Sequence, residues 1–147
     1  MPDTLTIIDG HSLLYQFHFA IRNLSTPQGE AIGATYGLTG LMLKFLREGS
    51  SHLAMCFDPK GKVFRHAIYP EYKANRPEMP EDLSNQFAYL KQIVEALGLQ
   101  WVSVDNYEAD DVMGTLAAEA TRRGIDTVLV TRDKDARQLL SKHVRLY

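Results

Sequence analysis

Short apolar segments alternate with longer amphipathic segments along the chain, and this alternation predicts the fold class. The short apolar runs indicate buried strands, and they occupy residues 5–8, 52–57, 99–104, 126–131 and 144–147. Apolar residues at three- and four-residue spacing predict helices between them, beginning near residues 12, 33, 81 and 108, with another through Leu139 and Leu140. This order is typical of an α/β domain with a mainly parallel central sheet and helices on both faces.

Turn and cap residues add detail to this pattern. The first strand ends at Asp9-Gly10, and its β-branched residues suit the centre of a parallel sheet. Ser12 is expected to cap the helix that follows. Gly98 is expected to end the helix that begins at Glu81.

The helix expected over residues 33–46 contains Gly33, Gly37 and Gly40. Each glycine costs about 1 kcal/mol relative to alanine inside a helix, so these positions need a compensating reason. Close packing of this helix against the sheet is the favoured interpretation. Approach of a phosphate backbone to the small face of the helix is the alternative.

Composition bounds the class of protein. The chain has 147 residues, is 45% hydrophobic, and carries a formal net charge of -2, which fits one globular domain and excludes nucleic-acid binding driven by overall positive charge. Its one cysteine, Cys56, can form no intramolecular disulfide, so a reducing, cytoplasmic location is expected. The N-terminal residues lack the pattern of a signal peptide, and no apolar run approaches the roughly 20 residues that span a bilayer.

A basic stretch interrupts this mildly acidic chain. Between residues 59 and 77 there are five basic residues and one acid, a local charge of +4. Phe64, Tyr69 and Tyr72 lie between the bases, which are Lys60, Lys62, Arg65, Lys73 and Arg76. Basic and aromatic side chains in one loop favour binding of a nucleic-acid strand, because cations bind phosphates and rings stack on bases. A solvated surface loop is the alternative.

Seven carboxylates follow the predicted strands. They are Asp9, Asp58, Glu108, Asp110, Asp111, Asp133 and Asp135. Because ligands of parallel sheets bind at the carboxyl ends of the strands, we expect these side chains to gather at that edge. Such a cluster repels itself unless cations join it, and oxygen ligands favour Mg²⁺ or Mn²⁺. A solvated, acidic first turn of a helix is the alternative for residues 108–111.

A carboxylate site for divalent metals beside a basic, aromatic loop favours phosphodiester hydrolysis. One or two ions would activate water and stabilise the leaving oxygen, and Lys73 and Arg76 would offset the charge that develops on the phosphate. The sequence contains no nucleophile elbow or phosphate-binding glycine loop. Its five histidines are scattered, without the spacing of zinc ligands.

Seven motifs form a recognisable set. They are Ile8-Asp9-Gly10, Gly33-Ala34-Thr35-Tyr36-Gly37, Phe57-Asp58, Phe64-Arg65-His66, Tyr72-Lys73-Ala74-Asn75-Arg76-Pro77, Tyr107-Glu108-Ala109-Asp110-Asp111 and Asp133-Lys134-Asp135. Together they resemble the N-terminal part of the 5′-nuclease domain (5′→3′ exonuclease, flap endonuclease-like) of bacterial DNA polymerase I, within the PIN-like superfamily. The resemblance runs nearly end to end and implies a PIN-like, resolvase-like fold.

The resemblance also implies roles for individual residues. The seven carboxylates would bind or support two Mg²⁺ or Mn²⁺ ions. Lys73 and Arg76 would contact the scissile phosphate, and Tyr72 would stack on a nucleotide. Further DNA contacts would come from Lys60, Lys62, Arg65 and Asn75. These residues would lie in a clamp or arch, at about residues 59–85, that embraces a single-stranded 5′ end.

The implied function is metal-dependent 5′→3′ exonuclease or 5′-flap endonuclease activity on DNA with a flap, a nick or a free 5′ end, in replication and repair. Such domains continue with a further aspartate motif and a helix–hairpin–helix segment that grips the duplex. Residues 1–147 are therefore expected to be the N-terminal, metal-binding part of a nuclease, with the rest of a polymerase polypeptide in cis.

Three residues depart from those common in the family: Gln16, Asn106 and Arg132. Asn106 is expected to keep a left-handed backbone, which asparagine tolerates. Arg132, beside the expected metal site, is expected either to bind DNA or to compete with a metal ion.

Other functions fit parts of the pattern. A fragment could bind DNA and metal without cleaving, because the downstream acids of the family are missing. A PIN-like ribonuclease shares the fold but usually lacks the loop motif of residues 72–76. A signalling receiver domain would place its acid pair after the first strand, where this chain has Asp9 alone.

Overall fold

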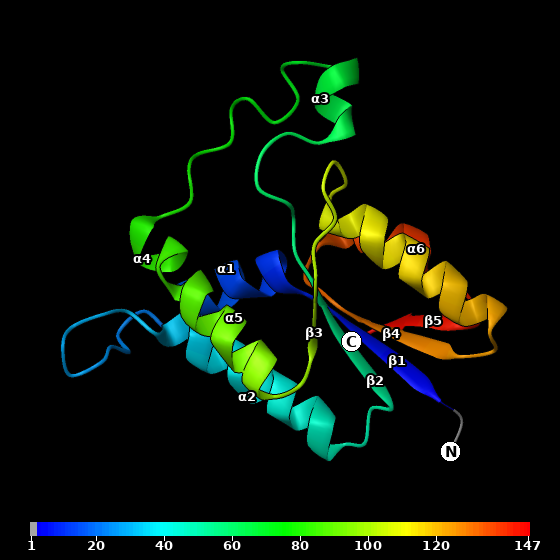
Figure 1. Ribbon diagram of the computed structural model, residues 1–147, viewed down its shortest axis with the longest axis horizontal. Coiled ribbons are helices and arrows are strands. Elements are labelled where there is room, and N and C mark those ends of the chain that lie inside the picture. Colours follow the sequence, from blue (N-terminus) through cyan, green and yellow to red (C-terminus); the bar gives the residue numbers. More distant parts are fainter. Residues whose placement is uncertain (1–2) are drawn as a thin grey trace.

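The computed structural model describes residues 3–147, and Figure 1 shows its helices and strands. The strands are β1 (Thr4–Asp9), β2 (His52–Cys56), β3 (Gln100–Val102), β4 (Asp126–Val130) and β5 (Val144–Leu146). The helices are α1 (Gly10–Ala20), α2 (Gly33–Arg47), α3 (Phe64–Ile68), α4 (Glu81–Ser84), α5 (Gln86–Ala96), α6 (Ala109–Arg122) and the 3₁₀ helix η1 (Lys134–Leu139). Of the helices in this described part, none has the length and apolar character needed to cross a membrane.

Within the described residues, the strands form one five-stranded, all-parallel sheet with the order β3-β2-β1-β4-β5. β1 lies at its centre, where Ile8 pairs with Met55 of β2 and Val130 of β4. The predicted fold class and the central place of the first strand are therefore confirmed. Because all strands run in one direction, their carboxyl ends share one edge, and Asp9 lies there at the end of β1.

Two apolar cores cover the two faces of the sheet. Alternate residues of a strand point to opposite faces, so Ile8 packs in the core of α1, α2 and α5, whereas Ile7 packs in the core of α6. Met42 of α2 and Met113 of α6 are fully buried in their respective cores. Helices therefore lie on both faces, as predicted (Figure 1).

Two glycines of α2 allow close packing against α1. A β-carbon at Gly33 would lie 1.9 Å from the carbonyl oxygen of Ile21, and one at Gly37 would lie 2.4 Å from the ring of Phe17. At Gly40, nothing in residues 3–147 lies within 4 Å of that position. Close packing is thus the correct interpretation for two of the three glycines, but the partner is α1 and the residue that ends it, not the sheet.

The start of α1 differs from the expected one. Asp9 is the N-cap, and its carboxylate accepts a hydrogen bond from the backbone N–H of Ser12 at 3.2 Å. The Ser12 hydroxyl accepts instead from the backbone N–H of Arg132, also at 3.2 Å. The predicted Ser12 cap is wrong, because α1 begins at Gly10 and Asp9 precedes it. Aspartate and serine cap helices about equally well, so residue type alone did not distinguish the two. The left-handed Gly98 does follow the end of α5, with a φ of +68°.

Three predicted elements differ in extent. The helix that begins at Glu81 is divided at Asn85 into α4 and α5. The third strand is confined to Gln100–Val102, because β3 is an edge strand with β2 as its one neighbour. The helix expected through Leu139 and Leu140 is the 3₁₀ helix η1, which ends at Leu139.

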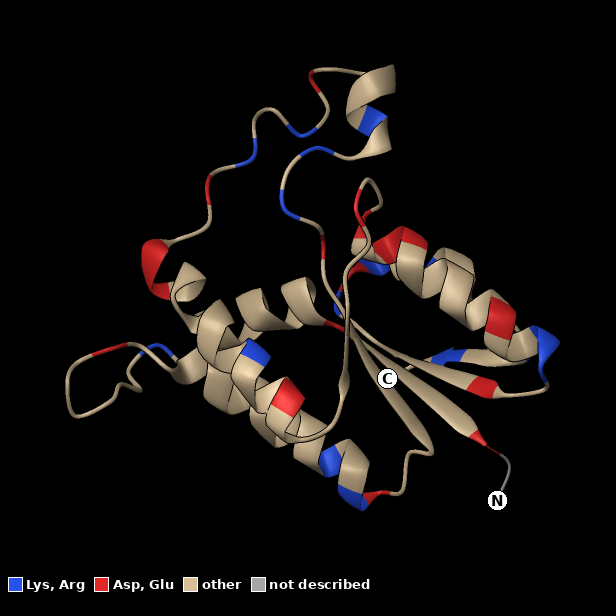
Figure 2. Cartoon of the chain, in the orientation of Figure 1, with Lys and Arg blue, Asp and Glu red and all other residues tan. Residues whose placement is uncertain are grey.

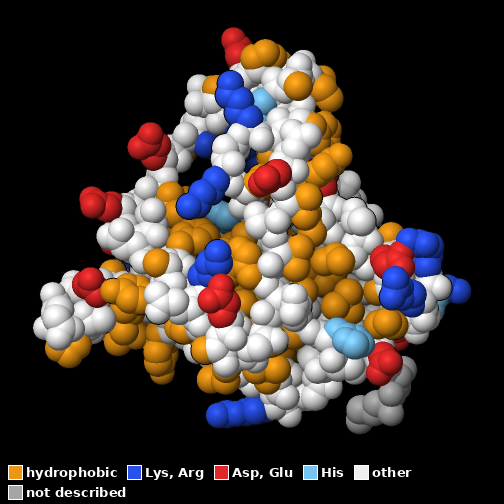
Figure 3. All heavy atoms as spheres, viewed as in Figure 1, with side chains coloured by type: hydrophobic (Ala, Val, Ile, Leu, Met, Phe, Trp, Pro, Cys, Tyr) orange, Lys and Arg blue, Asp and Glu red, His pale blue; other side chains and the backbone are white. Residues whose placement is uncertain are grey.

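Residues 59–80, called the arch below, leave the sheet and rise beyond its carboxyl edge (Figure 1). The backbone N–H of Phe64 donates to the carbonyl oxygen of Asn106 at 2.9 Å, which joins the arch to the loop before α6. Asn106 has a φ of +74°, so its expected left-handed backbone is confirmed. Figure 3 shows an opening between the atoms of the arch and the body of the molecule, with basic side chains at its border.

Candidate active site

A cleft of about 480 Å³ lies at the carboxyl edge of the sheet. Among the described residues, six of the seven predicted carboxylates line it: Asp9, Asp58, Glu108, Asp110, Asp133 and Asp135. The basic side chains that line it are Lys73, Arg76 and Arg132. Asp111 lies instead in a neighbouring hollow with Arg65 and Tyr72. The parallel sheet thus brings together acids that lie up to 126 positions apart, from Asp9 to Asp135.

Asp9 lies deepest, with 4% of its surface exposed. Its carboxylate accepts hydrogen bonds from the Thr131 hydroxyl at 2.7 Å and from the backbone N–H of Ser12 at 3.2 Å. Burial nevertheless raises the pKa of Asp9, because these two hydrogen bonds only partly replace the lost water. The cap of α1 and the acid of the cleft are therefore one residue.

Asp58 and Asp110 face the cleft from the end of β2 and the first turn of α6. One oxygen of Asp58 accepts from the backbone N–H of Ala109 at 2.7 Å. The carboxylate of Asp110 has no hydrogen-bond or ion-pair partner in residues 3–147. Burial, followed by the charges of Asp9, Asp133 and Asp58, raises the pKa of Asp110 to about 6. The protein itself leaves this charge uncompensated.

Asp133 and Asp135 project from the start of η1 and are exposed. Asp133 caps this helix, with its carboxylate accepting from the backbone N–H of Asp135 at 2.9 Å. The Thr131 hydroxyl accepts from the backbone N–H of Asp133 at 3.0 Å while it donates to Asp9. Thr131 therefore joins the acids of β1 and η1.

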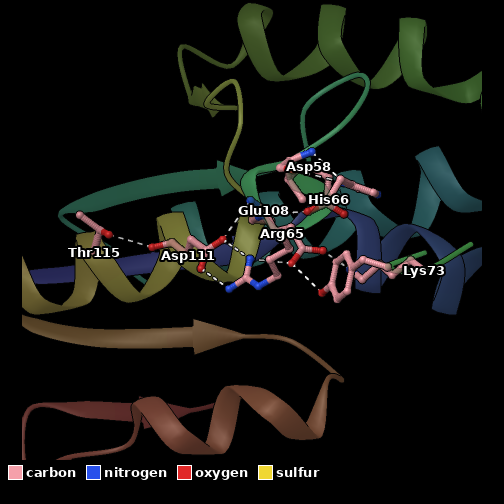
Figure 4. A network of polar contacts seen from close by, with 10 residues as sticks. Asp58, Arg65, His66, Lys73, Glu108, Asp111 and Thr115 are labelled. Atoms are coloured by element: carbon pink, nitrogen blue, oxygen red, sulfur yellow. Dashed lines mark hydrogen bonds and ion pairs between the residues drawn. The ribbon is translucent and has the colours of Figure 1, made fainter. Parts of the chain in front are cut away.

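Glu108 and Asp111 are neutralised by the arch, as Figure 4 shows. Arg65 of α3 donates to Asp111 through two hydrogen bonds of 2.7 and 2.8 Å and to Glu108 through a third of 2.8 Å. The hydrogen bond from Arg65 holds the pKa of Asp111 below its usual value. The Glu108 backbone N–H also donates to Asp111, at 3.1 Å, which orders the first turn of α6.

Lys73 and Tyr72 approach Glu108 from the other side of the arch. The Tyr72 hydroxyl donates to Glu108 at 3.0 Å, and the Lys73 ammonium forms an ion pair with the same carboxylate. Burial opposes the charge of Lys73, but the hydrogen bond and the charge of Glu108 outweigh it and raise the pKa of Lys73. Lys73 also has a φ of +56°, a strained backbone of the kind that gathers at functional sites.

The remaining predicted DNA contacts lie along the arch. Lys60, Lys62, Asn75 and Arg76 are exposed, and none forms a side-chain hydrogen bond or ion pair with the described residues. Figure 2 shows the basic residues spaced along both limbs of the arch. Arg65 differs, because its guanidinium already binds Glu108 and Asp111.

The seven acids thus fall into two sets. Glu108 and Asp111 are paired with cations of the arch, whereas five aspartates have no cation within the described residues: Asp9, Asp58, Asp110, Asp133 and Asp135. In residues 3–147 no group of three or more Asp, Glu, His or Cys side chains is arranged to hold a metal ion. The aspartates line the cleft without forming a closed cage.

Two residues that contact acids of the cleft were not predicted, and one of them, His11, lines it. Thr131 binds Asp9, and His11 accepts from the backbone N–H of Asp58 at 3.1 Å through Nδ1. The role of Thr131 follows from the strand register of the structure, because Ile8 pairs with Val130 and the next residues of β1 and β4 therefore lie side by side. His11 offered no such signal, since its partner lies 47 positions away.

Comparison with known sequences shows one family over nearly the whole chain. The family described as 5′-3′ exonuclease, N-terminal resolvase-like domain, matches residues 4–147. DNA polymerase I of Chloroflexus aurantiacus is 43% identical over 145 residues, which are 97% of this chain and 15% of that protein. The thermostable DNA polymerase I of Thermus aquaticus is 41% identical over 140 residues, 95% of this chain and 17% of that protein. The chain therefore spans about a sixth of the length of these relatives.

Solved structures of similar fold come from bacteriophage T5. Its 5′-exonuclease with bound zinc superimposes with a TM-score of 0.70 at 23% identity, over 98% of this chain and 54% of that chain. A T5 flap endonuclease complex with DNA and metal ions gives a TM-score of 0.69 at 22% identity, over the same shares of the two chains. At these identities the likeness establishes the fold.

Proposed function

Because the chain belongs to the family of 5′-3′ exonuclease N-terminal, resolvase-like domains, we propose that it is the metal-binding part of a 5′→3′ exonuclease and 5′-flap endonuclease that hydrolyses DNA phosphodiesters in replication and repair. One observation carries this proposal above the others. Five aspartates without a cation line a single cleft, and a basic arch rises beside it.

The chemistry of the aspartates fits divalent metal ions. Asp110 has its pKa raised to about 6 by burial and by neighbouring carboxylates, so a cation placed among them would remove a repulsion that the protein leaves uncompensated. The aspartates of the cleft offer carboxylate oxygens, which suit Mg²⁺ or Mn²⁺. The ions would be held by Asp9, Asp58, Asp110, Asp133 and Asp135, with Glu108 and Asp111 in support. Bound divalent ions supply activation of water and charge neutralisation.

The residues of the arch would bind the DNA strand. Lys73 and Arg76 line the same cleft as the aspartates, so a phosphate held by the two cations would lie next to the acids. Lys60, Lys62 and Asn75 are exposed along the arch and would bind the strand before it reaches the cleft. Tyr72 would stack on a base only after its hydroxyl leaves Glu108.

The partners are proposed on the same basis. The T5 structures contain metal ions and, in one case, DNA, which supports DNA with a 5′ flap, nick or free 5′ end as substrate. The relatives are whole DNA polymerases I, of which the matched region is 15–17%. We therefore propose that this domain is part of the same polypeptide as a polymerase. The clamp expected at about residues 59–85 contains the arch. A cytoplasmic location remains a prediction, supported by the unpaired, buried Cys56.

A second candidate is binding of DNA and metal without cleavage. The observation that favours it is the pairing of Glu108 and Asp111 with Arg65 and Lys73, since these carboxylates support a metal ion only after exchanging partners. Turnover of a flap substrate by the chain would exclude this candidate.

The test is a 5′-flap cleavage assay with Mg²⁺ or Mn²⁺, on this chain and on a version extended beyond Tyr147. We expect Asp110→Asn to reduce the cleavage rate by about 100-fold or more, since one carboxylate of the metal site is lost. The matched control is Asp105→Asn, an exposed residue outside the cleft, which should leave cleavage unchanged. Cleavage that persists in EDTA would refute the proposal.

A further inference from the structure

Arg132 is an exposed residue of the cleft that none of the proposed steps uses. It follows Thr131 at the carboxyl end of β4, next to the acids of η1. Its backbone N–H donates to the Ser12 hydroxyl at 3.2 Å, so α1 holds the main chain in place. The main chain of Arg132 is therefore held at the rim of the cleft.

The side chain of Arg132 is oriented by α1 as well. Its Nε–H donates to Oε1 of Gln16 at 3.2 Å. A guanidinium carries five N–H groups in a planar fork, of which this hydrogen bond uses one. The remaining four, on Nη1 and Nη2, have no partner in residues 3–147. Gln16 thus fixes one edge of the fork and leaves the other edge free.

Arg132 is also not neutralised by the acids beside it. No carboxylate of residues 3–147 forms an ion pair with it, although Asp133 is its immediate neighbour and Asp135 lines the same cleft. Arg65 and Lys73 of the arch behave differently, because both are paired with Glu108. Arg132 therefore keeps a full positive charge within a group of aspartates without occupying their oxygens.

A guanidinium that forms no ion pair can bind an anion that approaches the acidic cleft. The five uncompensated aspartates repel phosphate, and a free guanidinium edge is well matched to two phosphate oxygens. Arg76 offers such a cation from the arch, whereas Arg132 and Gln16 offer one from the side of β4 and α1. A strand that crosses the cleft would then be held on both sides.

We propose that Arg132, oriented by Gln16, binds a backbone phosphate of the DNA strand at the β4–α1 side of the cleft. This inference rests on the proposed function, and it adds a contact outside the arch. It also decides between the two roles expected for Arg132. The residue binds DNA and does not compete for the metal site, because its guanidinium is turned to Gln16 and pairs with neither Asp133 nor Asp135.

The test measures binding of a fluorescent 5′-flap DNA to the chain in EDTA, where metal-dependent cleavage cannot proceed, over a range of salt concentrations. Arg132→Ala should weaken binding about tenfold and reduce the slope of log K against log [salt] by about 0.7–0.9, the value for one phosphate contact. Gln16→Ala should weaken binding less and leave the slope unchanged, because the charge remains. The matched control, Arg145→Ala on β5, removes an exposed arginine outside the cleft and should change neither.

A scan of single neutral methylphosphonates along the DNA identifies the phosphate. At one position the substitution should weaken binding by the wild-type chain and have no effect on Arg132→Ala. Equal slopes for Arg132→Ala and the wild type, with normal binding by the wild type, would overturn the inference and leave the proposed function intact. Failure of the wild-type chain to bind flap DNA would overturn both.

Discussion

Arg65 and Asp111 are joined by two parallel hydrogen bonds, from Nη1 to Oδ2 at 2.7 Å and from Nη2 to Oδ1 at 2.8 Å. The two residues are 46 positions apart, one in α3 of the arch and the other in the first turn of α6. A third hydrogen bond from Arg65 reaches Glu108, the N-cap of α6. One guanidinium therefore holds the arch to the helix that carries the central acids.

Removing this guanidinium should destabilise the chain. Arg65→Ala leaves Asp111 and the nearly buried Glu108 without their strongest donor, so we expect the free energy of unfolding to fall by about 1–2 kcal/mol. Arg65→Lys should recover only part of this, since an ammonium cannot form the paired hydrogen bonds. Urea denaturation measures both changes.

The control for this prediction is Arg122→Ala. Arg122 forms an ion pair with Glu119 at the end of α6, but its side chain is 76% exposed. Its loss should change the free energy of unfolding by about 0.5 kcal/mol or less. Equal effects of the Arg65 and Arg122 variants would show that the pairing with the arch does not stabilise the fold.

Asp110 should make the metal-free chain less stable as the pH rises. In the folded chain the pKa of Asp110 is raised to about 6, against a usual value of 3.8, so the folded state binds the proton more tightly than the unfolded state. The free energy of unfolding therefore falls between about pH 4 and pH 6. Asp110→Asn should be more stable than the wild type at pH 7, by about 1 kcal/mol after allowance for solvent screening, with no gain below pH 4.

Urea denaturation in EDTA at pH 4, 5, 6 and 7 measures this trend. Asp105→Asn, the exposed control, should show no such gain. A stabilised Asp110→Asn also means that loss of cleavage by this variant does not reflect unfolding. A variant less stable than the wild type at pH 7 would contradict the repulsion inferred among the acids.

Asp111 should affect the pH dependence of stability in the opposite direction to Asp110. Arg65 lowers the pKa of Asp111, so the unfolded state binds the proton more tightly and the carboxylate stabilises the fold above its usual pKa of 3.8. Asp111→Asn should therefore lower the free energy of unfolding at pH 7, and the difference should shrink as the pH falls below about 4. Urea denaturation in EDTA, extended to pH 2 and pH 3, detects this, and a difference independent of pH would contradict it.

The glycines of α2 should respond differently to alanine. Gly37→Ala should destabilise the chain by about 1–3 kcal/mol, because the new β-carbon would lie 2.4 Å from the ring of Phe17. Gly40→Ala meets nothing within 4 Å in the described structure and should stabilise α2 by about 1 kcal/mol. Thermal denaturation compares the two, and melting temperatures that move in the same direction would contradict the packing of α2 on α1.

The buried side chain of Gln86 should stabilise the fold through its hydrogen bond. It is 1% exposed, and its Oε1 accepts from the backbone N–H of Thr35 at 3.0 Å, which joins α5 to α2. Gln86→Leu should cost about 2 kcal/mol, since it leaves that N–H buried without an acceptor. The exposed Gln92→Leu of the same helix is the control and should be nearly neutral in urea denaturation. Similar costs for the two variants would exclude a specific role for this hydrogen bond.

The periodicity of the chain determined most of the architecture. The spacing of apolar residues is a local property of the sequence that indicates strands and helices, so the parallel sheet and the central place of β1 were predictable. The position of each acid after a strand was predictable for the same reason, and the sheet edge places six of the seven in one cleft of the described structure. The ends of helices and strands were less predictable from the sequence. Asp9 and Ser12 are both good N-cap residues, and only packing selects Asp9.

Tertiary structure alone decided which acids remain without a cation. Asp110 and Asp111 are neighbours in the sequence and look alike there, yet successive residues of a helix point about 100° apart. Asp111 therefore meets Arg65 of the arch, and Asp110 faces the other acids of the cleft. The direction of Arg132 was likewise undecided in the sequence, because its partner Gln16 lies 116 positions away on α1. Such pairings depend on how distant segments dock, and no local pattern encodes them.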